Sequence, residues 1–431
     1  MRFETERPAT WQACVACGNE LTEHDPRARC PRCGGLLEIA HRPPGLGREE
    51  LLLRFTERRG RGSGVAASGV WRFREFVLPS AEKVVSHPEG NTPLLHREAI
   101  DRWSGIGGLL LKHEGHNPTG SFKDRGMTVG VTQAVRIGAR AVACASTGNT
   151  SASLAAYAAQ AGIPALVLVP AGNVASGKLA QSLAYGARTL LVRGGFDDCL
   201  RLVQEAGERL GVYLLNSINP FRIEGQKTIV LEMLEQLGWN PPDWIVLPAG
   251  NLGNTAALGK ALREALAWGL IDRVPRVAAV QAAGAAPFAR SFEEGFARRH
   301  RVEPETVATA IRIGDPASHD RAVRTIRETD GVVLAVTDEQ ILEAKAAVDA
   351  SGVGCEPASA ASVAGARELA RRGTIAPGAR VVAVLTGHVL KDPGMLLEYH
   401  VERDPPPPGA NRPVEIAADL REVERVLKSL E

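Results

Sequence analysis

A lysine beside a break in regular structure is the first residue of this chain that could do covalent chemistry. The run His116–Gly126 reads His-Asn-Pro-Thr-Gly-Ser-Phe-Lys-Asp-Arg-Gly, and its proline and glycine interrupt any regular element. Ser121 and Asp124 are typical of a helix N-cap pair, which predicts that Lys123 lies in the first helical turn. There the helix dipole and partial burial favour a neutral amine, which can attack a carbonyl and later act as a base. Taken alone, the motif fits a solvated lysine near a helix start better, and the motifs further along the chain reverse this preference.

Four cysteines near the N-terminus have the spacing of a metal site. Two Cys-x-x-Cys pairs, Cys14 with Cys17 and Cys30 with Cys33, are separated by a short loop, and each pair is followed by glycine. Four thiolates at this spacing suit tetrahedral Zn²⁺. Two disulfides or a redox dithiol are the alternatives. With all four ligands supplied by the protein, we expect one structural zinc ion per chain.

Three polar loops follow predicted strands, where parallel α/β sheets bind their ligands. Ser146-Thr-Gly-Asn-Thr150 places hydroxyls and an amide at a helix start. Pro248-Ala-Gly-Asn-Leu-Gly-Asn254 has the glycines that let backbone amides surround a phosphate. Thr386-Gly-His388 offers a neutral hydroxyl at a strand end. Each loop alone could be an ordinary cap or turn. Together with a nucleophilic lysine they match the aldehyde, ring oxygen, phosphate and ring nitrogen of pyridoxal 5′-phosphate.

The elements that must position these groups alternate between short apolar strands and amphipathic helices. Strand starts recur at even spacing, and the segments between them have helical periodicity. The strand starts are Ala141, Ala165, Arg188 and Val212. The pattern continues with helices at 226–237, 255–268, 338–350 and 358–371, and strands at 243–247, 276–280 and 380–385. It predicts an α/β protein with two open, mostly parallel α/β units around a central cleft.

These patterns predict five segments. Residues 1–44 are zinc-ribbon-like, and 45–69 form a solvated Arg/Gly-rich linker. Residues 70–117 and 216–403 form a large α/β domain, and 118–215 a small one. Residues 404–431 are a Pro-rich tail that can end in an amphipathic helix. Between Ala285 and the helix predicted at 338–350 the pattern blurs, and we assign no element there.

Bulk properties exclude several classes of protein. The chain has 431 residues, 44% of them hydrophobic and 23% charged, with a net charge of +2. It contains no apolar stretch long enough to span a bilayer, and its charge argues against a dedicated nucleic-acid binder. Residues 1–12 are polar and predict no secretory signal, so we expect a cytoplasmic protein without membrane partners.

Seven motifs resemble those of the threonine synthases, within the tryptophan-synthase-β-like (fold type II) family of pyridoxal-phosphate enzymes. The resemblance covers roughly residues 70–393, and the motifs at 216–227 and 385–393 are the most particular to threonine synthases. The seven motifs lie at 90–94, 117–125, 146–150, 216–227, 250–254, 356–361 and 385–393. His388 departs from the Asn that many relatives carry, which leaves finer specificity open. The four-cysteine segment is an accessory of some family members only.

The resemblance implies a role for each site residue. Lys123 is covalently linked to the cofactor, Asn149 binds its ring oxygen, and Thr386 faces its ring nitrogen. The cofactor phosphate is held by Gly250, Asn251, Leu252, Gly253 and Asn254. The phosphate of O-phosphohomoserine is bound by Ser146, Thr150, Asn216, Ser217 and Arg222. Arginine chemistry supports the last assignment, since a guanidinium offers phosphate a planar fork of donors.

The implied activity is conversion of O-phospho-L-homoserine and water to L-threonine and phosphate, by γ-elimination and β-hydration, in a homodimer. Related alternatives are a cysteate synthase and a threonine or serine dehydratase. An alternative of another class is a non-catalytic protein that binds pyridoxal phosphate or uses the zinc ribbon for interaction. The motif at 216–222 argues against a dehydratase, which needs no site for a substrate phosphate. The intact lysine motif argues against a non-catalytic protein.

Overall fold

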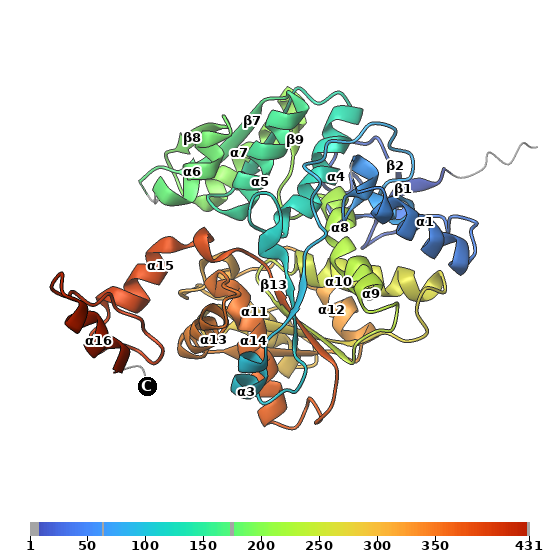
Figure 1. Cartoon of the computed structure of the whole chain (residues 1–431). Coiled ribbons are helices and arrows are strands. Elements are labelled where there is room, and N and C mark those ends of the chain that lie inside the picture. Colours follow the sequence, from blue (N-terminus) through green and yellow to red (C-terminus); the bar gives the residue numbers. More distant parts are fainter. Residues whose placement is uncertain (1–7, 63, 173–175, 429–431) are drawn as a thin grey trace, which may run out of the picture.

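The computed structural model describes residues 8–62, 64–172 and 176–428, and these contain three β-sheets (Figure 1). A small antiparallel sheet lies near the N-terminus, a parallel sheet of four strands forms one lobe, and a mostly parallel sheet of six strands forms the other. The predicted α/β class with mostly parallel sheets is confirmed. The domain boundaries stay predictions, as does the absence of a secretory signal, which rests partly on residues 1–7 outside the described range.

The N-terminal sheet has the strand order β2-β1-β3, with Cys14 at the end of β1 and Cys17, Cys30 and Cys33 in its connections. Its strands are β1 Thr10–Cys14, β2 Glu20–Thr22 and β3 Leu37–His41. Strand β3 packs against helix α8 (Pro220–Gln226) of the larger lobe. The cysteine-bearing segment is therefore docked on the body of the protein.

The prediction of a solvated linker at 45–69 is wrong, because this segment forms helix α1 (Arg48–Gly60). Leu51 and Phe55, one helical turn apart, are fully buried in the core of the six-stranded lobe. Arg58 pairs with Glu75 at 2.6 Å. The arginines and glycines of this segment suggested a linker, although Leu51 and Phe55 have the helical spacing needed to pack on the core.

The four-stranded sheet has the order β8-β7-β6-β9, with all strands parallel. The four predicted strand starts are confirmed: β6 Ala141–Ala145, β7 Ala165–Pro170, β8 Arg188–Val192 and β9 Val212–Leu214. Its helices are α4 Lys123–Arg136, α5 Asn149–Ala161, α6 Ser176–Ala184 and α7 Phe196–Leu210. Val142 and Cys144 face one apolar cluster while Ala143 and Ala145 face another, so both faces of the sheet are covered.

The six-stranded sheet has the order β12-β11-β10-β13-β5-β4, and only the edge strand β4 is antiparallel. Its strands are β4 Leu94–His96, β5 Leu110–His113, β10 Trp244–Pro248, β11 Arg276–Ala282, β12 Val332–Val336 and β13 Val381–Leu385. Its larger helices are α9 Thr228–Gln236, α10 Gly253–Ala267, α11 Pro287–Glu293, α12 His319–Glu328, α13 Asp338–Ala350 and α14 Pro357–Arg371. The helix predicted at 226–237 is confirmed as α9, α8 precedes it as a further helix, and the unassigned stretch contains α11, α12 and β12.

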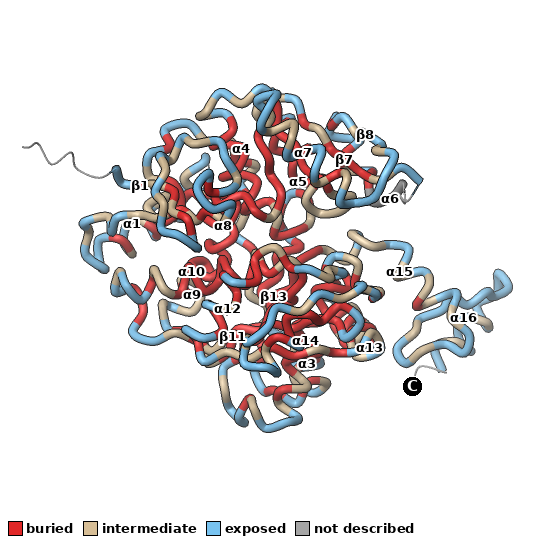
Figure 2. Tube along the Cα trace, turned by 180° about the vertical axis from the view of Figure 1, so that it is seen from behind, coloured by how far each residue is buried: buried red, intermediate tan, exposed pale blue. Residues whose placement is uncertain are grey.

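Short elements complete the chain. They are η2 Trp71–Phe73, α2 Arg74–Val77, α3 Glu98–Ser104, α15 Pro393–Leu397, a π-helix at Glu398–Glu402 and α16 Leu420–Lys428. The terminal amphipathic helix predicted for the tail is present as α16, which extends from the body and is exposed along its length (Figure 2). Among the described residues, no helix combines the length and apolarity needed to cross a membrane.

Candidate active site

Lys123 lies where the two lobes meet. It is the first residue of α4, whose helix covers the four-stranded sheet, while the preceding loop is bonded to the end of β13 in the six-stranded sheet. Phe122 donates its backbone N–H to the carbonyl of Thr386 at 3.0 Å, and Ser121 forms a bridge with Gly387. The predicted position in the first helical turn is confirmed, and β13 brings Thr386 next to it.

The predicted N-cap pair at Ser121 and Asp124 is wrong. Phe122 occupies the N-cap position without a side-chain cap, and the hydroxyl of Ser121 has no hydrogen-bond partner among residues 8–62, 64–172 and 176–428. The Asp124 carboxylate instead accepts hydrogen bonds from the backbone and hydroxyl of Thr119, at 2.7 and 2.6 Å. Asp124 thereby fixes the loop that leads into Lys123.

The surroundings of Lys123 favour the neutral amine. Its Nζ makes no ion pair with a described residue and lies 4.1 Å from the centre of the Phe122 ring. Burial and the positive charge of Arg222 lower the pKa of Lys123 to about 7, with Glu356 acting in the opposite direction. At neutral pH a large fraction of such an amine is unprotonated and can act as a nucleophile or a base.

A buried carboxylate joins two of the predicted site residues. Glu356, at the start of α14, accepts a hydrogen bond from the Asn149 amide at 2.9 Å and from the Thr386 hydroxyl at 3.2 Å. Burial raises the pKa of Glu356, although these hydrogen bonds oppose the shift. The sequence marked Glu356 only as part of a motif, and its pairing with Asn149, 207 residues away, had no local signal.

The loop 250–254 joins β10 to α10 and has the form of a cup. Leu252 adopts a left-handed φ of 62°, which is unusual for leucine and typical of strained functional loops. A side chain at Gly250 would lie 3.0 Å from the Ile311 Cα, so the backbone there is closely packed. Asn251 is used structurally: its side chain accepts from Ala317 N–H at 3.1 Å.

Polar side chains without partners surround this cup. The unpaired buried atoms there are Gln226 Oε1, both polar side-chain atoms of Asn254, Thr255 Oγ1 and Ser318 Oγ. A side chain added at Gly253 would meet Gln226 and Ser318 only at ordinary contact distance, 3.8 Å or more, so nothing is packed tightly against the N-terminus of α10. The hydroxyls of Thr255 and Ser318 and the Asn254 amide nitrogen are donors at a helix N-terminus, which fits a phosphate group. These residues therefore fit pyridoxal phosphate, and Ser318 is a candidate that the sequence did not reveal.

Arg222 is a buried cation without an acidic partner among the described residues. It lies on α8, where Asn219 caps the helix by accepting from the N–H groups of Phe221 and Arg222. Its Nη1 donates to the Leu215 carbonyl at 3.0 Å, and its Nε has no partner in the part of the chain that the structure describes. Burial lowers the pKa of Arg222 to about 10, so it stays charged at neutral pH. A guanidinium in this state is suited to an anion.

The remaining predicted phosphate ligands differ in what they can offer. Ser146 and Thr150 are half-buried around the N-terminus of α5. Ser217, which belongs to the motif at 216–227, is also half-buried. Asn216 is different, because its amide accepts from Ala145 N–H at 3.0 Å and donates to the Ala145 carbonyl at 3.2 Å. Asn216 thereby holds the loop at 146–150 in place, and because its amide nitrogen has a second N–H, its phosphate contact stays a prediction.

Three long helices begin at the site. Helix α4 starts at Lys123, α5 at Asn149 and α10 at Gly253. The first-turn N–H groups of a helix carry partial positive charge. The predicted cofactor and substrate contacts therefore share a region of positive potential.

A buried ion network supports the start of α4. Arg125 pairs with Glu114 at 2.6 Å and with Glu232 at 2.9 Å, and Lys112 and Arg72 also pair with Glu232, at 2.6 and 3.2 Å. All five side chains are essentially inaccessible to solvent. Removing one partner of such a network leaves an uncompensated buried charge and costs several kcal/mol, on the order of 3–5. The network is a rigid support below Lys123.

The four cysteines converge as predicted. The Sγ atoms of Cys14 and Cys33 are 3.4 Å apart, those of Cys17 and Cys33 are 3.3 Å apart, and those of Cys17 and Cys30 are 3.7 Å apart. No disulfide links them, and all four Sγ atoms lie within 4.8 Å of one another. Four thiolates around one zinc ion would be separated by roughly 3.8 Å, so the cluster fits this metal.

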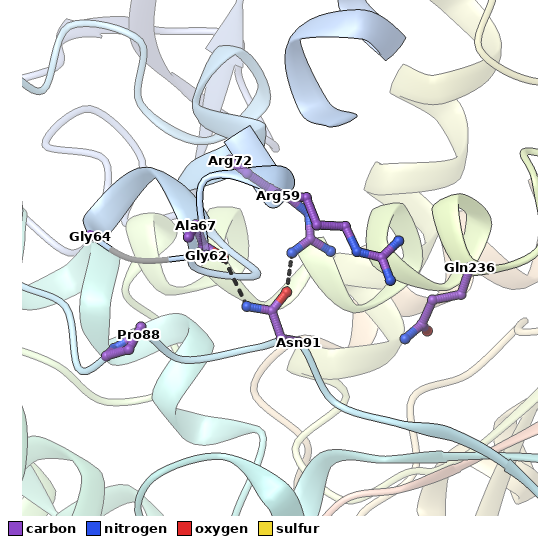
Figure 3. Close-up of a pocket in the computed structure, with 8 residues that line it drawn as sticks. All are labelled: Arg59, Gly62, Gly64, Ala67, Arg72, Pro88, Asn91 and Gln236. Atoms are coloured by element: carbon purple, nitrogen blue, oxygen red, sulfur yellow. Dashed lines mark hydrogen bonds between the residues drawn. The ribbon is translucent and has the colours of Figure 1, made fainter. Parts of the chain in front are cut away.

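A separate cavity of about 330 Å³ does not include the predicted site residues. Arg59, Arg72, Asn91 and Gln236 line it, with Gly62, Gly64, Ala67 and Pro88 (Figure 3). In the wall of this cavity, the Asn91 side chain accepts a hydrogen bond from Arg72 and donates one to the Ala67 carbonyl. Through Arg72 this cavity borders the ion network, and Lys123 is not among the residues that line it.

Comparisons with known proteins agree on a family. The profile of the family described as "Pyridoxal-phosphate dependent enzyme" matches residues 85–387. The chain is 43% identical over 425 residues to a threonine synthase of Methanocaldococcus jannaschii, covering 97% of this chain and 100% of that protein. The crystal structure of threonine synthase from Escherichia coli has a TM-score of 0.68 at 19% identity, covering 98% of this chain and 100% of that one. The processed threonine deaminase isoform 2 from Solanum lycopersicum has a TM-score of 0.62 at 22% identity, covering 80% and 92%. Both structural matches show the fold alone.

Proposed function

The chain belongs to the pyridoxal-phosphate dependent enzyme family, and we propose that it works as a threonine synthase, converting O-phospho-L-homoserine and water to L-threonine and phosphate. The observation that carries this proposal is Arg222, a buried guanidinium with no acidic partner among the described residues, close enough to Lys123 to lower its pKa. The deaminase match has a similar fold, so the fold alone does not choose between these activities. A buried guanidinium that stays charged at neutral pH, close to the reactive amine, favours a substrate that carries a phosphate.

We assign the cofactor contacts as follows. Lys123 provides the amine that binds the cofactor aldehyde, and Asn149 and Thr386 bind the ring oxygen and ring nitrogen. The loop from Gly250 to Asn254 holds the phosphate, with the Ser318 hydroxyl as an added partner. The unpaired atoms around this loop support the assignment. When bound, the cofactor supplies an electron-withdrawing ring that stabilises negative charge on the substrate α-carbon.

The chain's own residues then move protons and bind the leaving group. Lys123, with a pKa of about 7, can accept a proton from the substrate and return it at a neighbouring carbon. Arg222, with Ser146, Thr150 and Ser217, binds the substrate phosphate and stabilises the charge that develops as the carbon–oxygen bond breaks. Asn216 positions the loop at 146–150 through its two bonds to Ala145. Thr386 is a neutral hydroxyl, so it does not force a proton onto the ring nitrogen.

The purified enzyme loaded with pyridoxal phosphate tests this function directly. Incubation with O-phosphohomoserine should release phosphate and L-threonine in equal amounts. L-Threonine and L-serine, supplied in separate reactions, should yield little 2-oxo acid. Rapid 2-oxo acid formation without phosphate release would identify a dehydratase and reject the proposal.

The lowered pKa of Lys123 predicts an unusual pH profile of its reactivity. Below about pH 7 the amine is protonated and unreactive, and above it the amine is neutral, so the reaction rate should rise through pH 7 and then level off. Trace acetylation of the cofactor-free protein by acetic anhydride, which reacts only with the neutral amine and does not itself titrate, followed by peptide mass spectrometry, measures this rate. The exposed Lys83 provides the internal reference. Arg222→Gln should move the midpoint upward, because it removes a repelling positive charge. A rate for Lys123 that keeps rising to pH 10 would contradict the profile.

We further propose that the cysteine cluster binds one structural Zn²⁺ per chain. The sulfur distances support this metal, and four protein ligands leave no open coordination position. Metal analysis of protein purified under reducing conditions should give one zinc per chain. Cys17→Ser with Cys33→Ser should remove the zinc and lower the melting temperature by several degrees, since the metal stabilises only the folded ribbon. Zinc-free protein with an unchanged melting temperature would rule out this structural role.

The setting of the enzyme is also a proposal. The seven cysteines form no disulfide among themselves, which is consistent with the cytoplasm. The resemblance to family members supports a homodimer. The net charge of +2 provides no basic excess for nucleic acid.

A further inference from the structure

The cysteine-bearing segment contacts both lobes. On the small lobe, the Glu23 carboxylate pairs with Arg136 of α4 at 2.7 Å, and the Glu23 carbonyl accepts from Gln133 at 2.6 Å. On the large lobe, the carbonyls of Leu37 and Ile39 on β3 accept from Arg321 and Lys260. If the cysteine-bearing segment had no role beyond its own fold, it would not need contacts to the helices that carry the active site.

The most buried of these contacts is a hydrogen bond between His41 and Glu224. The imidazole Nε2 of His41, at the end of β3, lies 2.7 Å from the Glu224 carboxylate, with the two side chains 1% and 0% exposed. The hydroxyl of Thr10 lies 3.1 Å from Nδ1. Burial and the charge of Lys227 lower the pKa of His41, so the ring is neutral, donates from Nε2 and accepts from Thr10.

Glu224 is fixed from three sides. Besides His41, it accepts hydrogen bonds from Lys227 at 2.5 Å and from Lys260 of α10. Burial disfavours the Glu224 carboxylate, but the two lysines outweigh it and hold the pKa well below its ordinary value. Glu224 is therefore a charged, fully satisfied anchor in the middle of α8.

Helix α8 has little freedom to move independently. A side chain added at Gly225 would lie 1.7 Å from the Arg125 carbonyl, so α8 touches the backbone of α4 directly. Its other side is held by Glu224 against the ribbon and α10. Arg222 is two residues before Glu224 on the same short helix. Any shift of Glu224 would displace the guanidinium that faces Lys123.

We propose that His41 is a positioning residue for the substrate-phosphate site, and that through Glu224 it fixes α8 and hence Arg222. This inference rests on the proposed function, in which Arg222 binds the substrate phosphate. It gives the ribbon a role in substrate recognition that is separate from its contribution to stability. His41 itself touches neither substrate nor cofactor.

The test is the kinetics of His41→Leu in the zinc-bound, cofactor-loaded enzyme. The variant keeps the volume of the side chain but loses the bond to Glu224. We expect the KM for O-phosphohomoserine to rise about tenfold while kcat changes less than threefold, because ground-state binding is weakened. Inhibition by inorganic phosphate should weaken in parallel, and the cofactor absorbance should stay unchanged. His41→Gln, whose amide can still donate to Glu224, should recover most of the affinity.

Two controls separate positioning from a general effect on the interface. Glu38→Gln removes the contact of the same strand with Arg324, at 3.7 Å on α12, and should leave KM within twofold of the parent. In a double-mutant cycle, His41→Leu should add little to Arg222→Ala if both act on the same contact. Additive effects, an equal rise in KM for Glu38→Gln, or an unchanged KM for His41→Leu would each overturn the inference.

Two further outcomes are distinguishable. If His41→Leu fails to fold, Thr10→Val takes its place, because it only frees the imidazole; a KM rise of about threefold is then expected, and no rise overturns the inference. A parent enzyme that releases no phosphate from O-phosphohomoserine rejects the proposed function. An active parent that is impaired by Arg222→Ala and indifferent to His41→Leu rejects the positioning role alone.

Discussion

Replacing Lys123 with alanine is expected to abolish turnover and the covalent attachment of the cofactor together. The amine is proposed to bind the cofactor and to transfer the substrate proton, and Lys123 is the one lysine in the sequence of the segment 116–126. Loss of proton transfer alone lowers rates by roughly 10²–10⁴-fold, and loss of the nucleophile adds to this. We therefore expect a fall in kcat of more than about a thousandfold.

The measurement pairs steady-state phosphate release with borohydride reduction and peptide mass spectrometry. The parent should carry the reduced cofactor on Lys123, and Lys123→Ala should carry none while its circular dichroism spectrum is unchanged. Lys83→Ala, an exposed substitution, serves as the matched control. A reducible linkage that persists in Lys123→Ala would place the attachment on another residue.

Replacing Arg222 with alanine is expected to lower kcat/KM for O-phosphohomoserine by about a hundredfold or more. The loss removes a charge-assisted contact from a buried site, which corresponds to a few kcal/mol, about 2–3. Arg222→Lys keeps the charge but loses the planar fork, so its defect should be smaller and still clear. Both variants should retain the cofactor spectrum, because a different loop holds the cofactor phosphate.

Turnover is measured beside the cofactor absorbance for each variant, with the exposed Arg140→Ala as a control for lost surface charge. Near-normal kcat/KM in Arg222→Ala would remove Arg222 from the substrate site. Loss of pyridoxal phosphate in the same variant would instead assign Arg222 to the cofactor.

Local pattern was enough to predict the parallel sheets. Val142 to Ala145 and Ile245 to Leu247 are apolar on both faces, because helices cover both sides of each sheet, and this leaves an unbroken apolar run in the sequence. Strand β12, Val332–Val336, has the same character. It was missed because the surrounding polar stretch shows no helical periodicity, so the alternation of strands and helices could not be followed through it. Helix α1 was missed because its composition suggested a connector.

Side-chain roles were less predictable, because they depend on partners far away in the sequence. Asn216 was predicted to bind phosphate from its motif, and that role stays a prediction, but its bonds to Ala145, 71 residues earlier, had no local signal. Ser318 has no motif of its own and reaches the 250–254 loop only through tertiary packing. Asp124 was expected to cap a helix, but its carboxylate accepts hydrogen bonds from the backbone N–H and the hydroxyl of Thr119 instead. Lys123 and Arg222 stood out because their chemistry is rare in a buried setting.

The three helices that start at Lys123, Asn149 and Gly253 have a consequence for how the substrate arrives. Their aligned peptide dipoles and the guanidinium of Arg222 create a field that extends beyond contact range, to about a Debye length, roughly 8 Å at physiological salt. A doubly charged phosphate ester is drawn by this field before any hydrogen bond forms, and a neutral amino acid is not. Discrimination between the two thus begins in the diffusional encounter, and it weakens as ionic strength shortens the reach of the field.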